Sequence, residues 1–225
     1  MNKYEKIKEI VEKELLGLDA GHDMKHVMRV YKLCLRISKK FKDVDMEVLR
    51  TATLLHDIGG PKEVKDKSGK TCHAKESAKM AQKILKDFGY SKEEINKITH
   101  CILSHRFRAG LEKPKTKEAK ILYDADRLDI LGAIGIARTF IWIGDKHAQI
   151  YRDIPLKEYI KENLVGGKTN GRIKDKTKHT VFFDYELKLK KIPKRLYTQE
   201  AKKIAKKRLA YMDRFFKKLK QEIGV

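Results

Sequence analysis

Apolar residues recur at steps of three and four along most of this 225-residue chain, and this helical period constrains the fold more than any other feature of the sequence. One stripe follows Asp23, which is a suitable N-cap for the helix that carries it. Its members are Val27, Val30, Cys34, Ile37 and Phe41. A convincing period of two is missing, and the only β-like window is 179–185. The sequence therefore predicts an all-α protein, a compact multi-helix bundle.

Glycine, proline and capping residues divide the pattern into separate helices. Gly59-Gly60-Pro61 ends the third of them, so His56 and Asp57 are expected in its last turn. A capping box at residues 91–94 opens another. The stretch 118–143 is apolar on several faces and predicts one long central helix. Residues 165–180 are expected to form a surface loop, and a final helix is expected after Thr198.

The length and an apolar fraction of 41% allow a hydrophobic core without disulfide or metal staples. No repeat or linker marks a boundary, so we expect a single domain over 1–225, with a core at 20–150 and C-terminal helices at 151–225 packing on it. The longest apolar stretch, 130–137, is too short to span a bilayer. Neither a secretory signal nor a disulfide framework is evident, which predicts a cytoplasmic protein.

The chain carries 53 basic and 31 acidic residues, a formal charge of +22. Half of the excess lies in residues 186–220, where 14 Lys or Arg face three acids. Lysine, a strongly hydrated point charge, dominates, and this favours a solvated face that attracts anions in general. Binding of nucleic acid through this segment stays open, as does burial of the last helix's apolar stripe in an oligomer.

Two histidines and two aspartates stand out because each lies in or beside an apolar helical stretch. They are His26, His56, Asp57 and Asp126. Imidazole and carboxylate form the mixed ligand set that suits Mn, Fe, Co, Ni or Zn. A structural hydrogen-bond network is the alternative interpretation of the His56-Asp57 pair.

These residues resemble the His…His-Asp…Asp signature of the HD-domain phosphohydrolase superfamily, and the local strings resemble its small stand-alone YedJ/YpgQ-like branch. The strings are HDMKHV at 22–27, LLHDIG at 54–59 and DADRLD at 124–129 followed by GAIGIARTF at 132–140. The resemblance implies an HD-type helical bundle whose four signature residues hold one divalent metal ion. It also implies hydrolysis of phosphate esters or anhydrides, and in this branch manganese-supported conversion of nucleoside triphosphates to monophosphates and pyrophosphate.

Further candidates surround this signature. His73 and His105 are expected to support catalysis or to bind a second metal, an interpretation that follows from the resemblance. Asp129, one turn after Asp126, is a third supporting candidate, and a surface ion pair is its alternative role. Asp23 either orients His26 or only caps its helix. The positions between Asp57 and Lys62 hold no Glu or Lys, so the acid-base residue that some HD branches place there is lacking.

Arg127 and Arg138 are candidate phosphate-binding residues, because a planar guanidinium suits bidentate contact with phosphate oxygens. Buried structural ion pairs are the alternative for both. The predicted function is a metal-dependent phosphohydrolase that cleaves a nucleotide phosphoanhydride with metal-activated water. Manganese is favoured over Mg, Fe, Co, Ni or Zn. The alternatives are a basic helical nucleic-acid-binding protein with a structural His/Asp cluster, and an HD phosphodiesterase or phosphomonoesterase.

Overall fold

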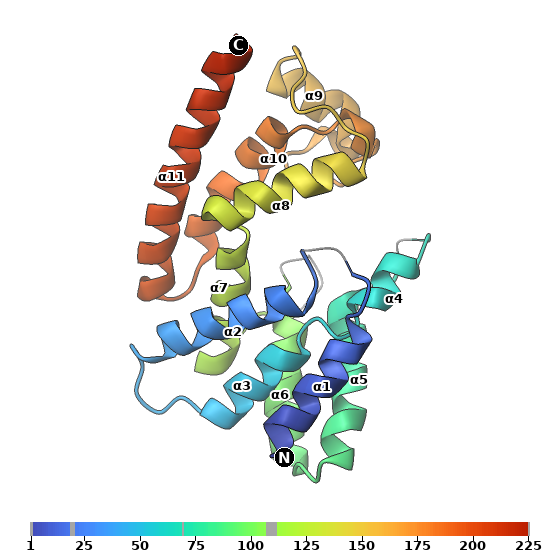
Figure 1. Cartoon of the computed structure of the whole chain (residues 1–225), viewed down its shortest axis with the longest axis vertical. Helices are drawn as coiled ribbons and strands as arrows, with labels where there is room; N and C mark the ends of the chain where they lie inside the picture. The colour runs from blue at the N-terminus through green and yellow to red at the C-terminus, as the bar shows by residue number, and fades with distance from the viewer. Residues whose placement is uncertain (1, 19–20, 69, 107–111, 225) are drawn as a thin grey trace. The chain divides into compact units, whose positions relative to one another are not determined.

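The structure is a computed structural model that describes residues 2–18, 21–68, 70–106 and 112–224 (Figure 1). Helices form throughout these ranges, and the extended pairing within them is limited to an isolated bridge between Leu164 and Ile173. The prediction of an all-α fold is confirmed. Contacts divide the chain into two compact units, the first comprising 1–129 with 197–201 and the second 130–196 with 202–225. The expected single domain stays a prediction.

The first unit contains seven helices among its described residues. They are α1 Lys3–Glu14, α2 Met24–Ser38, α3 Met46–Leu55, α4 Gly60–Lys65, α5 His73–Asp87, α6 Lys92–Ser104 and α7 Lys117–Asp129. Helix α2 packs against α3 and α7, while α6 packs against α3, α5 and α7. The apolar stripes of these helices supply fully buried side chains such as Val27, Leu49 and Ile98. Burial of these stripes fixes how each helix is rotated about its axis, and so where its polar residues point.

Capping residues set where these helices begin. The side chain of Asp23 accepts a hydrogen bond from the backbone N–H of His26 at 2.9 Å, which starts α2 and places His26 in its first turn. Ser91 and Glu94 form the expected capping box at the start of α6. Asp23 therefore caps its helix through this bond to the main chain of His26.

The second unit contains α8 Gly132–Asp145, α9 Leu156–Asn163 and α10 Val181–Leu187. Short 3-10 helices span Val165–Gly167, Lys176–Lys178 and Leu189–Arg195. Helix α11, Gln199–Ile223, begins in the first unit and continues in the second. Tyr159, Leu164 and Phe183 form a small hydrophobic core, with the rings of Tyr159 and Phe183 stacked at a centroid distance of 4.0 Å.

Two expectations about local structure are wrong, and the β-like window is helical. The predicted central helix over 118–143 is two helices, because Leu131 is extended and Gly132 has a φ of +78° that a continuous right-handed helix does not allow. The β-like window 179–185 lies mostly in α10, where the Thr180 side chain accepts from the backbone N–H of Phe183 and starts a helix. Helix α3 ends at Leu55, so His56 is its C-cap and Asp57 follows it.

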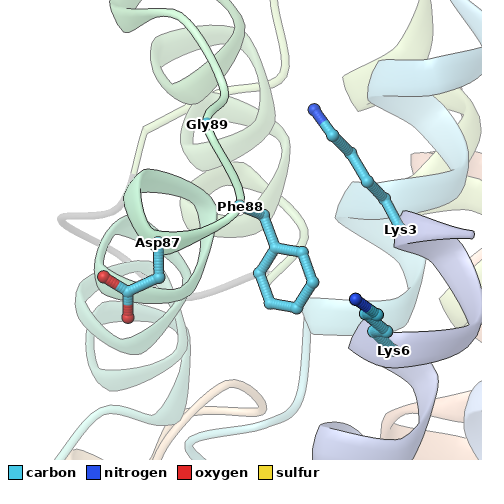
Figure 2. A pocket seen from close by; sticks show the side chains of 5 residues that line it. All are labelled: Lys3, Lys6, Asp87, Phe88 and Gly89. Atoms are coloured by element: carbon cyan, nitrogen blue, oxygen red, sulfur yellow. The ribbon is translucent and has the colours of Figure 1, made fainter.

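Within the described ranges, none of the helices combines the length and the apolarity needed to cross a bilayer. A surface hollow lies beside the N-terminal end of α1 and the turn after α5, lined by Lys3, Lys6, Asp87, Phe88 and Gly89 (Figure 2). None of the predicted site residues lines this hollow. Its side chains do not form a set of converging ligands, so it carries no assignable chemistry.

Candidate metal centre

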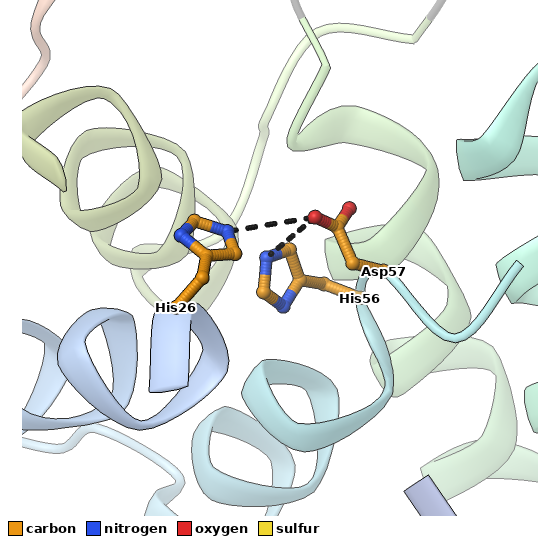
Figure 3. Close-up of side chains that lie close together, drawn as sticks. All are labelled: His26, His56 and Asp57. Atoms are coloured by element: carbon orange, nitrogen blue, oxygen red, sulfur yellow. Dashed lines mark ion pairs between the residues drawn. The ribbon is translucent and has the colours of Figure 1, made fainter. Parts of the chain in front are cut away.

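Three elements of the first unit bring the four signature residues together. His26 comes from α2, Asp126 from α7, and His56 and Asp57 from the chain just after α3. Figure 3 shows the imidazoles of His26 and His56 turned toward the same carboxylate oxygen of Asp57. Both Nε2 atoms lie close to Asp57 Oδ2, at 3.5 Å for His26 and 3.6 Å for His56. His26 Nε2 also lies 3.6 Å from Asp126 Oδ1.

The second ring nitrogen of each histidine determines its tautomer. His56 Nδ1 lies 2.7 Å from the carbonyl oxygen of Thr53, which can only accept, so Nδ1 carries the hydrogen. His26 Nδ1 lies 2.8 Å from Asp129 Oδ2 and donates in the same way. In the neutral form of both side chains, the lone pair is therefore on Nε2. Both lone pairs face Asp57 Oδ2, and that of His26 also faces Asp126 Oδ1.

Buried atoms around the Asp57 carboxylate lack hydrogen-bond partners. Among the described residues, His56 Nε2 and Asp57 Oδ1 are buried and have no hydrogen-bond partner. Unpaired buried polar atoms are rare and costly, because they have given up their bonds to water. His26, His56 and Asp57 offer ligand atoms that lie within 4.8 Å of one another. This donor set fits a divalent cation with mixed nitrogen and oxygen ligands, which would pair all of these atoms.

Burial and charge act in opposite directions on the histidines. Burial lowers the pKa of His56 to about 4 despite the nearby Asp57 carboxylate, so this imidazole is neutral near pH 7, as a ligand must be. Burial also opposes the charged form of His26. There, the carboxylates of Asp129 and Asp57 outweigh burial and raise the pKa to about 9. A site that favours positive charge to this degree also favours a cation.

Burial and neighbouring charges also shift the pKa values of the Asp57 and Asp126 carboxyls. Burial disfavours ionisation of Asp57, but the imidazole of His56, together with His105 and His26, holds the pKa of this carboxyl well below its usual range. Burial likewise opposes ionisation of Asp126, and the guanidinium of Arg127 with the imidazole of His26 lowers the pKa. Both groups are therefore ionised acceptors near neutral pH.

A second group of ligand atoms lies on the other side of Asp57. His73 from the start of α5 and His105 from the end of α6 each place Nε2 at 3.4 Å from Asp57 Oδ1. Their Nε2 atoms are 3.1 Å apart. His105 Nδ1 donates to the carbonyl of Ile102, so its lone pair also faces Asp57. The two oxygens of Asp57 thus face two different pairs of histidines.

Asp129 contacts a predicted ligand residue. It accepts from His26 Nδ1 and also receives two hydrogen bonds from Arg29, at 2.8 and 2.9 Å. These donors hold the buried carboxylate in one orientation, and it in turn orients the His26 imidazole. Metal-bound histidines usually have such a carboxylate or carbonyl on their second nitrogen. The sequence analysis included Asp129 but did not identify Arg29, whose position one turn after His26 is a signal that could have found it.

The two candidate arginines have different surroundings. Arg127 donates to Asp126 Oδ2 and to the carbonyl of His105, both at 3.3 Å, and its guanidinium lies over the ring of Tyr123. It is therefore fixed at the edge of the centre, and its side chain is 18% exposed. Arg138 lies on α8 in the second unit. Phosphate binding by either residue stays a prediction.

Glu63 is a residue that the sequence analysis missed. It lies one position beyond Lys62, in the first turn of α4, and contacts His73 and Arg106. The expectation that the positions between Asp57 and Lys62 hold no Glu or Lys does not cover this position. The signal available in the sequence was a Glu six residues after Asp57, at the start of a helix that Gly60 and Pro61 permit. Its distance in space from His73 depends on how α4 folds back on α5.

An all-α unit with this buried His/Asp centre defines a class of protein, the helical proteins that can bind a divalent metal ion. The comparison with known proteins names the family. The sequence profile of the HD domain matches residues 24–131. YpgQ of Bacillus subtilis is 31% identical over 222 residues, which cover 97% of this chain and 93% of YpgQ. The chain therefore belongs to the HD-domain family.

Solved structures agree with this assignment. The crystal structure of Bacillus subtilis YpgQ in complex with ADP matches with a TM-score of 0.71 and 25% identity, over 98% of this chain and 97% of that one. An HD-superfamily hydrolase from Bacillus thuringiensis matches over the full length of both chains, with a TM-score of 0.67 and 27% identity.

A shorter sequence match joins 46% of this chain to 37% of the 3′-5′ exoribonuclease YhaM of Bacillus subtilis, at 29% identity.

Proposed function

We propose that this protein cleaves the phosphoanhydride of a nucleotide, converting a nucleoside triphosphate to the monophosphate and pyrophosphate. The observation that carries the proposal is the convergence of four imidazole Nε2 atoms on the two carboxylate oxygens of Asp57. The similarity to YpgQ, which was crystallised with ADP, supports a nucleotide as the substrate. The formal charge of +22 adds a general attraction for polyphosphates.

The proposed cation ligands are His26, His56, Asp57 and Asp126. Manganese is the proposed metal, and Mg, Fe, Co, Ni and Zn are the competing candidates for this donor set. When bound, such a cation lowers the pKa of water and neutralises charge on the phosphoryl group. His56 and His26 contribute their Nε2 lone pairs, while Asp57 and Asp126 contribute negative charge that balances the cation.

The remaining residues have supporting roles in this proposal. His73 and His105, with Asp57, form a site for a second cation or hold a proton for the leaving group. Asp129 positions His26 and does not touch the substrate. Arg127, at the edge of the centre, and Arg138 are proposed to contact phosphate oxygens.

A panel of metals and substrates with product identification tests the proposal. Chelator-treated protein is supplied with Mn²⁺, Mg²⁺, Co²⁺, Ni²⁺ or Zn²⁺, and with nucleoside triphosphates, diphosphates, monophosphates or a short RNA. The expected products are nucleoside monophosphate and pyrophosphate from triphosphates, separated by ion-exchange chromatography. Release of inorganic phosphate alone, or cleavage of RNA alone, would contradict cleavage between the α- and β-phosphates.

Variants connect the activity to the centre. His56→Ala and Asp57→Ala are expected to abolish both metal retention and hydrolysis, because each removes a buried ligand atom. His147→Asn is the matched control, since His147 is exposed and Asn tolerates its left-handed backbone, with a φ of +51°. Full metal content in both ligand variants would overturn the ligand assignment.

Hydrolysis of a phosphodiester is the second candidate function. The YhaM match, which spans 118 residues, is the observation that favours it. The RNA arm of the panel distinguishes it from anhydride cleavage. Release of 5′-mononucleotides at a higher kcat/KM than any nucleoside triphosphate would make the diester the preferred substrate class.

A further inference from the structure

The carboxylate of Glu63 sits between an imidazole and a guanidinium. It contacts His73 Nδ1 and accepts from the backbone N–H of His73 at 3.2 Å. Arg106 donates to both of its oxygens, from Nη1 to Oε2 at 2.9 Å and from Nη2 to Oε1 at 2.7 Å. This bidentate contact fixes the plane of the Glu63 carboxylate. It thereby fixes the position of the oxygen that contacts His73 Nδ1.

The charge of Glu63 determines which ring nitrogen of His73 carries the hydrogen. The Arg106 guanidinium, which donates to both carboxylate oxygens, stabilises the ionised form of Glu63. An ionised carboxylate accepts and cannot donate, so His73 must carry its hydrogen on Nδ1. The lone pair on Nε2 then points toward Asp57 Oδ1 and His105 Nε2, at 3.4 and 3.1 Å.

We propose that Glu63, held by Arg106, is a positioning residue that keeps His73 in the Nδ1–H tautomer and presents its Nε2 lone pair to a cation at Asp57 and His105. The inference rests on the proposed function, because it concerns the orientation of a ligand in one half of the same metal centre. The contact of Glu63 with the centre is made through His73, on the side that His73 and His105 form.

The amide of glutamine makes a sharp test, because it keeps the size of Glu63 and changes its hydrogen bonding. In Glu63→Gln, the NH₂ group can donate to His73 Nδ1 and so permits the opposite tautomer, in which Nε2 carries the hydrogen. A protonated Nε2 cannot ligate a cation. Glu63→Asp keeps an ionised acceptor and is the conservative variant for rescue.

Glu76→Gln is the matched control. Glu76 lies on α5, three residues after His73, and pairs with Lys62 of α4 at 3.0 Å. It therefore joins the same two helices as Glu63 without touching a histidine of the centre in any contact assigned to it. Any loss that comes only from loosening α4 against α5 should appear in this variant as well.

The first measurement is the long-range ¹⁵N–¹H spectrum of the histidine rings in chelator-treated full-length protein at pH 7.5, with His73→Asn used to assign the His73 signals. The wild type, Glu63→Asp and Glu76→Gln are expected to show the Nδ1–H tautomer of His73, and Glu63→Gln the Nε2–H tautomer. This readout needs neither metal nor turnover, so it stands even if the protein hydrolyses no nucleotide.

The second measurement is calorimetric titration of the same proteins with Mn²⁺ alone. Removal of a group that orients a ligand typically weakens metal binding by roughly 10- to 100-fold. We expect a loss of this size in Glu63→Gln, restored in large part by Glu63→Asp and absent in Glu76→Gln. The proposal is overturned if Glu63→Gln matches Glu76→Gln in either the His73 tautomer or the Mn²⁺ affinity.

Discussion

At the scale of single residues, the bond made by one ring nitrogen decides what the other can do. Thr53 O accepts a hydrogen bond from His56 Nδ1, and Asp129 accepts one from His26 Nδ1. The Nε2 lone pairs of both histidines then face Asp57. Carbonyls and carboxylates are pure acceptors, so the tautomers follow from chemistry rather than from side-chain type. The imidazoles of the centre are prepared as ligands by their neighbours.

Asp129 provides a prediction at this scale. Asp129→Asn keeps the shape of the side chain but removes the charge that holds His26 Nδ1–H and Arg29. We expect Mn²⁺ affinity to fall by roughly 10- to 100-fold, as for other groups that orient a metal-bound histidine. Competition with a chromophoric chelator measures the Mn²⁺ affinity. Asp87→Asn, at an exposed aspartate outside the centre, should bind like the wild type, and equal affinities for the two variants would refute the positioning role.

Tyr90 provides a prediction of pH dependence. Burial and the hydrogen bond to Glu47 raise the pKa of this phenol to about 12, from about 10 in an unfolded chain. Its contribution to stability is therefore complete below pH 10 and is lost as the pH rises toward 12. Near pH 8, Tyr90→Phe should lower the free energy of unfolding by about 1 kcal/mol.

Urea unfolding between pH 8 and pH 12 checks this sign. The difference in stability between the wild type and Tyr90→Phe should shrink above pH 10. Tyr151→Phe, at a half-exposed tyrosine, serves as the control and should follow the wild type throughout. A difference that grew with pH would show that Tyr90 does not hold its proton more tightly in the folded state.

At the scale of elements, helix ends rather than helix middles place the functional groups. His26 is in the first turn of α2, His56 caps α3, His73 begins α5 and His105 caps α6. Periodicity predicts a helix interior well, because a buried stripe repeats. Helix ends depend on caps and on single φ angles, which is why the break at Gly132 and the short helix α4 were not predicted.

Gly132 tests the importance of such a break. Gly132→Ala must hold alanine at a φ of +78° and bring its Cβ to 3.1 Å from the side chain of Arg208, so it should destabilise by about 1–2 kcal/mol. Gly144→Ala on the same helix meets no atom within 4 Å and should be neutral or stabilising, by up to about 1 kcal/mol. Denaturant unfolding of both variants measures the contrast, and equal stabilities would mean that α8 adjusts freely at its start.

At the scale of the whole molecule, the centre links three helices that contact one another through their apolar stripes. A cation bound to residues of α2, of α7 and of the chain just after α3 binds only the folded chain, so it should raise the stability of the first unit. At 100 times the dissociation constant, this linkage supplies about 2.7 kcal/mol. For a chain of this length, that corresponds to about 5–10 °C in melting temperature.

Calorimetry with and without Mn²⁺ measures this shift. The wild type should melt higher in Mn²⁺ than in chelator, and His56→Ala should melt at the same temperature in both. His147→Asn should respond like the wild type. A wild-type melting temperature that did not depend on Mn²⁺ would contradict a site built across these helices.

The sequence by itself determined the fold class, the helix interiors and the types of residue at the candidate centre. Apolar period, His-Asp adjacency and the strings around His26 and Asp126 were enough for this, because they are local. The tertiary structure decided which atoms meet: both oxygens of Asp57 with four imidazoles, Asp129 with Arg29, and Glu63 with His73. These contacts join residues up to 100 positions apart, and only burial of the apolar stripes brings them together.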